Sequence, residues 1–161
     1  MPCIWGVHNG SQLFLVVTVL PIPEMPLSTA EPGSPYFGPM ATVRALVDTG
    51  ATSTCISKNV AREVGFEPVG KVQVHGVGGL VSHNSYLFHI AFPFQMAGQL
   101  SPNLPPPNAG QVQASLHVLE KLIQGFEFDN ASAGFDVLLG MDVIATGSLV
   151  VQGNGTFSFS F

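Results

Sequence analysis

The sequence predicts a mainly β fold, and three observations support this class. Thirteen Pro and eighteen Gly in 161 residues divide the chain into short segments. The apolar runs between these breaks are rich in β-branched residues, which favour strands. At the end of the chain apolar and polar residues alternate strictly, so Phe157, Phe159 and Phe161 are predicted to lie on one face of a strand. The length predicts one domain over residues 1–161.

The composition excludes some classes of function. Charged residues are only 9% of the chain and hydrophobic residues 46%. A monomer would have few charged side chains with which to cover its surface, so we expect an oligomer with an apolar interface. Five Lys and Arg and a formal charge of -5 argue against nucleic acid or an anionic membrane as partner. The apolar run 13–20 is too short for a membrane helix. Two cysteines, Cys3 and Cys55, make no disulfide framework and fit a reducing, cytoplasmic setting.

The first third of the chain predicts two strands separated by a loop. Residues 13–19 form a continuous apolar, β-branched run, which predicts the first core strand. Six prolines follow within residues 21–39, and this composition predicts a surface loop. Residues 41–47 predict a second strand, which ends at Asp48.

A short helix and a hairpin are predicted next. Ser57 is a suitable N-cap and Gly65 a suitable C-terminal stop, with apolar residues at helical spacing between them: Val60, Ala61 and Val64. Residues 72–75 and 80–94 then flank a glycine-rich tip. Two strands around such a tip predict a β-hairpin whose tip is mobile.

The last third predicts further strands and one more helical segment. Residues 97–111 contain a polyproline tract and predict a second loop, and residues 124–134 predict a turn region. The other predicted elements are a half-buried strand at 112–118, a buried strand at 135–140, one or two helical turns at 141–147, and a terminal hairpin at 148–161.

Three separated motifs carry the functional argument. Leu46-Val47-Asp48-Thr49-Gly50-Ala51 ends a strand at a carboxylate and a glycine turn. Asp before such a turn is by itself most often structural. It is followed, in order, by Gly76-Val77-Gly78-Gly79 and by Val137-Leu138-Leu139-Gly140-Met141-Asp142. Together these motifs resemble the retropepsin-like aspartic proteases, single-domain enzymes that act as homodimers. The terminal hairpin resembles cellular and bacterial members more than viral ones.

The resemblance implies a closed, mostly antiparallel β-barrel with one or two short helices and an active site on the dimer axis. It implies that Asp48 is catalytic, that the Thr49 hydroxyl bonds across the axis, and that Gly50 lets the backbone approach the carboxylates. The substrate would be an extended peptide, covered by a flap from each subunit. The residues implied in substrate binding are Ala51, Thr52, Gly76, Val77, Gly78 and Gly79.

The chemistry agrees with this implication. Peptide hydrolysis needs a base to activate water and an acid to protonate the leaving group, and two close carboxylates that share one proton can supply both. One chain offers one such residue, Asp48, so a twofold axis would place it beside its symmetry mate. No metal or other cofactor is expected.

Two positions depart from many viral members of the family. Those proteins carry an Asp and an Arg that form a salt bridge around the active site, where this chain has Thr52 and Met141. Both partners are replaced together, which indicates a different support for the dimer. It also leaves open an alternative function, a non-catalytic module for dimerisation or peptide binding.

Other polar residues are expected to have structural roles. Asp136 lies within a buried-strand pattern, and Asp142 lies where it can cap a helix. Cys55 is expected to be a packed thiol. The histidines show no metal-ligand spacing and are expected at surface or edge positions: His8, His75, His83, His89 and His117.

Overall fold

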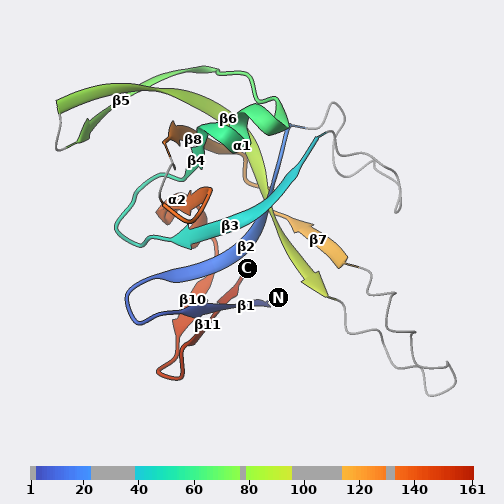
Figure 1. Ribbon diagram of the computed structural model, residues 1–161. Coiled ribbons are helices and arrows are strands. Elements are labelled where there is room, and N and C mark those ends of the chain that lie inside the picture. The colour runs from blue at the N-terminus through green and yellow to red at the C-terminus, as the bar shows by residue number, and fades with distance from the viewer. Residues whose placement is uncertain (1–2, 23–38, 77–78, 96–113, 130–132) are drawn as a thin grey trace, which may run out of the picture.

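The computed structural model describes residues 3–22, 39–76, 79–95, 114–129 and 133–161 (Figure 1). The mainly β class is confirmed, because these residues form strands and two short helices. In chain order the elements are β1 (Cys3–His8), β2 (Leu13–Leu20), β3 (Ala41–Val47), β4 (Cys55–Ser57), α1 (Lys58–Val64), β5 (Gly70–Gly76), β6 (Gly79–Gln95), β7 (Ala114–Val118), β8 (Ile123–Phe128), β9 (Val137–Leu139), α2 (Met141–Ile144), β10 (Ser148–Val151) and β11 (Thr156–Ser160).

Six strands close into a ring, which agrees with the predicted barrel. Neighbouring strands follow the order β2, β3, β9, β4, β8 and β6, and β6 pairs again with β2 where Thr18 lies opposite Ala91. Most pairs are antiparallel, but β9 runs parallel to β3 and β4 runs parallel to β8. Closure matters because a strand with neighbours on both sides offers no free edge.

The terminal strands extend this sheet beyond the ring. β11 lies between β10 and β1, with Phe159 opposite Ile4. Residues 13–19 form a core strand, as predicted, but it is not the first strand of the sheet, which is β1. Its pattern is weak: Ile4 is buried, while Trp5 is 66% and Val7 61% exposed. β1 pairs with β2 only at Val7 and His8, and its other residues pair with β11, a partner too distant for local sequence to show.

The alternating end of the chain packs as predicted. Phe157 and Phe159 are buried, and Phe161 is partly buried against the same core. The ring centroid of Phe92 lies 5.6 Å from that of Phe159 and 4.5 Å from that of Phe161. The last strand thus supplies aromatic rings to the interior.

The predicted helix is confirmed as α1, with both of its caps. The Val60 N–H donates to Ser57 Oγ at 3.3 Å, and Gly65 ends the helix with φ of 77°. Val60, Ala61 and Val64 are buried, so the helix packs one face on the barrel. None of the helices in the described ranges is long and apolar enough to cross a membrane.

The prediction of a turn region at residues 124–134 was wrong over its first half, which belongs to β8. A glycine in such a segment usually marks a break in a strand. Here, instead, a Cβ on Gly125 would lie 2.8 Å from the Phe88 ring and 2.9 Å from the Thr54 carbonyl oxygen. Gly125 therefore permits close packing inside a strand. Of the two predicted loops, 97–111 lies outside the described residues and 21–39 almost wholly so.

Candidate active site

Asp48 lies at the end of β3, directly beside β9. Val47 pairs with Leu139 in a parallel ladder, and the Asp48 N–H donates to the Leu139 carbonyl oxygen at 2.9 Å. Ala45, Val47 and Leu139 are buried, so the packed ends of β3 and β9 fix the backbone of Asp48. Its side chain is half-buried and remains partly open to solvent.

A tight turn follows Asp48 and orients its carboxylate. The Gly50 N–H donates to Asp48 Oδ1 at 2.8 Å, and the Ala51 N–H donates to the Asp48 carbonyl oxygen at 3.2 Å. A Cβ on Gly50 would lie 3.2 Å from Oδ1, closer than ordinary contact. The glycine thus lets the backbone approach the carboxylate, and the hydrogen bond from the Gly50 N–H orients that carboxylate within the loop.

Gly140 packs directly against the loop from behind. A Cβ at this position would lie 2.5 Å from the Ser53 carbonyl carbon and 2.7 Å from its oxygen. The Met141 N–H donates to the Ala51 carbonyl oxygen at 2.8 Å, and the Asp142 N–H donates to that of Thr52 at 3.2 Å. The segment after β9 therefore holds the Asp48 loop by backbone contacts that only glycine at 140 permits.

Thr54 and Asp142 support the same loop through their side chains. Thr54 is fully buried; its hydroxyl donates to Asp142 Oδ1 at 2.7 Å and accepts the Gly140 N–H at 3.1 Å. The Thr54 N–H donates to Asp142 Oδ2 at 3.0 Å. Asp142 Oδ1 also accepts the Val143 N–H at 3.0 Å in the first turn of α2. Asp142 is a structural residue, as predicted, and its partner Thr54 is one that the sequence patterns did not indicate.

The other loop residues are open to solvent. Thr49, Gly50 and Thr52 are exposed, and Met141 is 38% exposed. The two positions that replace the viral Asp and Arg therefore make backbone contacts to the loop segment while their side chains lie at the surface. Among the described residues, the side-chain support of the loop comes from Thr54 and Asp142.

The predicted hairpin is formed by β5 and β6. Their register runs from Gly70 opposite Ser85 to Gly76 opposite Gly79. Of the predicted substrate-binding residues, Val77 and Gly78 lie outside the described residues. In Figure 1 the hairpin extends to the upper left, on the side toward which β3 ends. Its role as a flap stays a prediction.

Two further polar predictions have different outcomes. The Ser57 hydroxyl, which caps α1, donates to Asp136 Oδ1 at 2.9 Å, so Asp136 has the structural role that was predicted for it. The prediction of a surface or edge position was wrong for His89, which is 8% exposed with Nδ1 3.1 Å from the Leu119 carbonyl oxygen. This backbone partner satisfies the ring and makes burial possible. Within the described ranges, no three His, Cys, Asp or Glu side chains are placed to hold a metal ion.

Cys55 is buried behind the loop, and its reactivity can be tested. Burial raises the pKa of its thiol to about 12, and the charges of Asp142 and Asp48 act in the same direction. Because the thiolate is the reactive form, iodoacetamide at about pH 8 should modify the exposed Cys3 in the folded protein and leave Cys55 free. Mass spectrometry should find two modified thiols after unfolding. Equal labelling of both in the folded protein would contradict this placement.

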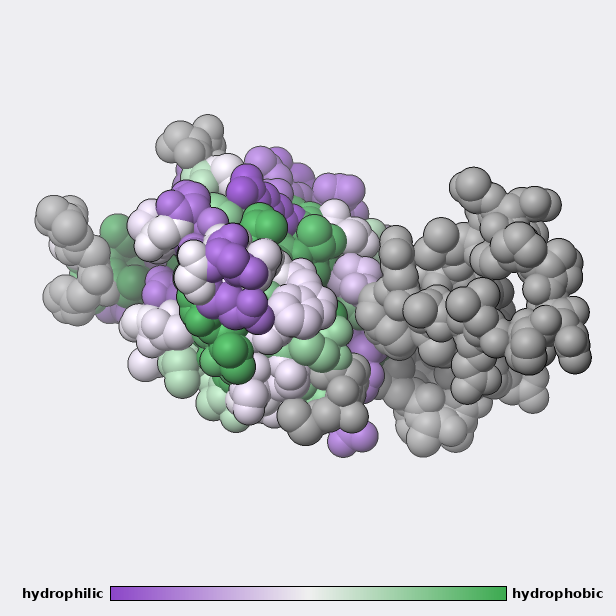
Figure 2. All heavy atoms as spheres, turned by 90° about the horizontal axis from the view of Figure 1, so that it is seen from below, coloured by the Kyte–Doolittle hydropathy of each residue, from purple (hydrophilic) through white to green (hydrophobic). Residues whose placement is uncertain are grey.

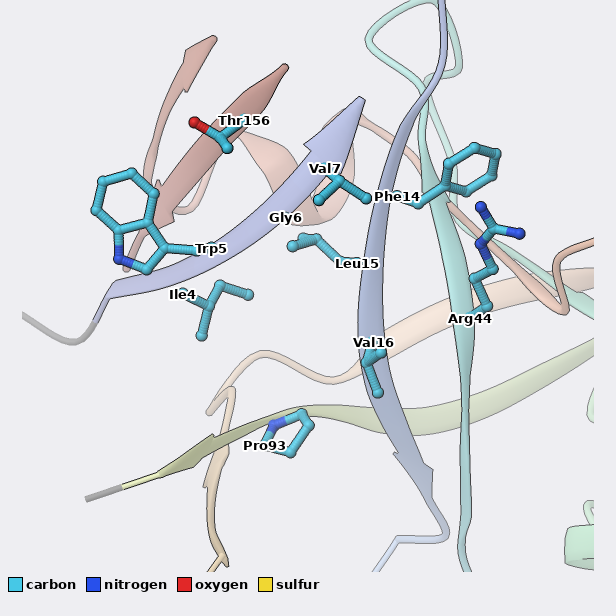
Figure 3. Close-up of a pocket in the computed structure, with 10 residues that line it drawn as sticks. All are labelled: Ile4, Trp5, Gly6, Val7, Phe14, Leu15, Val16, Arg44, Pro93 and Thr156. Carbon is cyan, nitrogen blue, oxygen red and sulfur yellow. The ribbon is translucent and has the colours of Figure 1, made fainter. Parts of the chain in front are cut away.

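A separate groove of about 490 Å³ opens between β1, β2 and β6 (Figure 3). Trp5, Val7 and Pro93 line it, and at one side the Arg44 guanidinium carbon lies 3.7 Å from the centroid of the Phe14 ring. Its described lining does not include the Asp48 loop. The groove is therefore distinct from the candidate active site.

Comparison with known proteins supports the family resemblance and the fold. The family described as "gag-polyprotein putative aspartyl protease" matches residues 40–97, which span β3 to β6 and include Asp48. No curated protein matches the sequence. A crystal structure of a retropepsin-like aspartic protease from Rickettsia conorii is similar, with a TM-score of 0.52 and 11% identity over 98% of this chain and 89% of that one. These matches confirm the resemblance: the chain is similar to the retropepsin-like aspartic proteases and has their fold.

Proposed function

We propose that this protein is an aspartic endopeptidase in which Asp48 and its copy in a second subunit activate water for peptide hydrolysis. The observation that carries this proposal is the Asp48 loop. Its carboxylate is partly open to solvent and held by the Gly50 N–H, while Gly140, Thr54 and Asp142 support the backbone from the buried side. Electrostatic and acid–base catalysis both require a carboxylate held in advance in one geometry.

The proposed enzyme is a homodimer, since one chain supplies one carboxylate of the pair. The exposed Thr49 would bond across the axis. The low charge content supports an apolar contact between copies, as do apolar side chains that are about half exposed or more on the terminal and neighbouring strands: Trp5, Val7, Val16, Val150 and Val151. Figure 2, which views the molecule from below, shows hydrophobic side chains in the open between hydrophilic ones.

The proposed substrate is a peptide in extended conformation, bound between the Asp48 loop and the β5–β6 hairpin. Such a peptide gains affinity from main-chain hydrogen bonds, while its alternate side chains enter pockets. Ala51, Thr52 and the residues of the hairpin tip would contact it. We also propose a reducing, cytoplasmic location, which the two free cysteines support.

Cleavage of an unstructured peptide library, with and without a statine-type inhibitor, tests the proposal. We expect cleavage that the inhibitor abolishes, because the inhibitor's hydroxyl takes the place of the attacking water between the carboxylates. The rate should fall at alkaline pH, where the pair no longer holds its shared proton. A rate that keeps rising into alkaline pH would contradict a shared-proton pair.

Two other results would change the proposal. Binding of peptides without inhibitor-sensitive cleavage would favour the alternative, a peptide-binding module, which the exposed Thr52 and Met141 leave open. Sedimentation at high concentration should find a dimer. A protein that stays monomeric cannot bring two Asp48 carboxylates together and would overturn the enzyme proposal.

A further inference from the structure

The β5–β6 hairpin leaves the barrel at Ser85. Among the described residues, β6 pairs with β5 alone from Gly79 to Asn84. Ser85 lies opposite both Gly70 of β5 and Phe126 of β8, and from this residue onward β6 is a barrel strand. Figure 1 shows the β5–β6 hairpin extending away from the barrel. Contacts around Ser85 therefore set the direction of the hairpin.

The Glu127 side chain binds β6 just beyond the last pair of the β6–β8 ladder. Continuing the register would place Glu127 opposite Asn84, but the described pairing ends at Ser85 and Phe126. Beyond that pair, side-chain hydrogen bonds to the Glu127 carboxylate take the place of the backbone ladder. Oε1 accepts the Asn84 N–H at 3.3 Å. Oε2 accepts the Asn84 side-chain amide at 3.2 Å and the Tyr86 hydroxyl at 2.8 Å. Asn84 and Tyr86 are two residues apart in a strand, so they present one face to it. We call these three residues the Glu127 cluster.

The Glu127 cluster is attached to the barrel and not to the hairpin alone. Tyr86 is 5% exposed, and its ring centroid lies 6.4 Å from that of Phe66, which stacks on Phe88 at 5.6 Å. The Phe66 N–H donates to the Ala61 carbonyl oxygen at the end of α1. A rigid base of this kind can hold a projecting hairpin in one direction.

Charge strengthens these contacts. Burial alone would raise the pKa of Glu127, but the hydrogen bonds from Tyr86 and Asn84, together with the charge of Lys58, outweigh it and lower that pKa. Burial raises the pKa of Tyr86, and the hydrogen bond to Glu127 adds to the effect. At neutral pH the carboxylate is ionised while the hydroxyl keeps its proton. Hydrogen bonds to an ionised acceptor are roughly twice as strong as neutral ones.

We propose that Glu127 is a positioning residue: through Asn84 and Tyr86 it fixes the base of the β5–β6 hairpin, so that the hairpin keeps its place over a peptide bound at Asp48. The inference about the peptide rests on the proposed function. The inference about the hairpin does not, because it concerns the free protein.

Three variants test the cluster against one control. Glu127→Gln keeps the shape and removes the charge, and its amide group turns a donor toward the donors of Asn84 and Tyr86. Tyr86→Phe removes one donor and keeps the packed ring, and Asn84→Ala removes the side-chain amide. Glu120→Gln removes the same charge from an exposed residue of the β7–β8 turn and is the matched control. Tyr86→Phe and Asn84→Ala leave the carboxylate in place, so these two variants still test the cluster if Glu127→Gln does not fold.

Hydrogen exchange of the substrate-free protein is the first measurement. We expect backbone amides of residues 79–84 to exchange about tenfold faster in Glu127→Gln, and less so in the other two variants, with β2 and β3 unchanged. The second measurement is peptide cleavage, where we expect KM to rise about three- to tenfold with kcat within about twofold. Glu120→Gln should match the unaltered protein in both.

Each outcome decides one part of the inference. Exchange at residues 79–84 that stays unchanged in all three variants would overturn the role of Glu127 in holding the hairpin. Faster exchange with an unchanged KM would overturn the positioning of substrate. An unaltered protein that cleaves no peptide would overturn the proposed function and the substrate part with it, while the exchange result would still decide whether the cluster holds the hairpin.

Discussion

Asp48→Asn is expected to lower the rate of peptide cleavage by at least about a thousandfold, because it removes both carboxylates of the proposed pair at once. Asparagine has nearly the same shape, and its side-chain oxygen can still accept the Gly50 N–H that Asp48 Oδ1 accepts at 2.8 Å. The fold and the dimer should therefore persist. Initial rates on one cleaved peptide, with sedimentation and thermal unfolding of the same sample, measure all three properties.

The control for this variant is Glu67→Gln, which removes an exposed carboxylate far from the Asp48 loop in sequence. It should cleave the peptide at the unaltered rate. Retained activity in Asp48→Asn would exclude the mechanism. Lost activity together with a lost dimer would show that Asp48 serves assembly, and the assignment of catalysis to it would then fail.

Gly140→Ala is expected to lower the free energy of unfolding by about 3 kcal/mol, the upper end of what overpacking usually costs. The added Cβ would lie 2.5 Å from the Ser53 carbonyl carbon, and backbone atoms cannot rotate away as a side chain can. Moving Ser53 would also disturb the buried contacts of Thr54 with Asp142. Urea unfolding followed by tryptophan fluorescence or circular dichroism measures the change.

Gly153→Ala is the matched control, because the Cβ it adds in the β10–β11 turn would meet no atom within 4 Å. Its free energy of unfolding should stay within about 0.5 kcal/mol of the unaltered protein. Equal stability of the two variants would contradict the close packing of Gly140 on the Asp48 loop. Cleavage by Gly140→Ala under conditions where it remains folded should also fall, since the loop that carries Asp48 must shift.

Local patterns in the sequence were sufficient for the parts of the fold that local physics determines. The helix α1 was predicted from its caps, Ser57 and Gly65, because each satisfies backbone groups within a few residues. The strands around Asp48 and Gly140 were predicted because buried strands of a few apolar residues end abruptly at glycine turns. The Asp48 turn and the segment behind it could therefore be matched from their residues alone.

Contacts between distant segments explain the features that sequence patterns did not predict. Thr54 meets Asp142 across 88 positions, and Glu127 meets Asn84 across 43. A threonine in a loop or a glutamate in a strand carries no local sign of such a partner. The prediction failed at Gly125 for the same reason, because the Phe88 ring that requires this glycine belongs to another strand. Apart from the Gly50 and Ala51 N–H bonds to Asp48, the polar contacts described at the candidate site are tertiary, and short-range patterns do not encode them.

The pairing of β1 with β11 affects how the chain can be made. β1 lies near the start of the chain and needs residues 156–160 as its neighbour. A ribosome therefore releases β1 and β2, which pair at Val7 and His8, long before β11 exists, and most of β1 lacks its neighbour during that time. Folding that depends on such distant pairing is slow and leaves apolar strands open to wrong partners. Assistance from chaperones during synthesis would matter more for this protein than for a helical bundle of the same length.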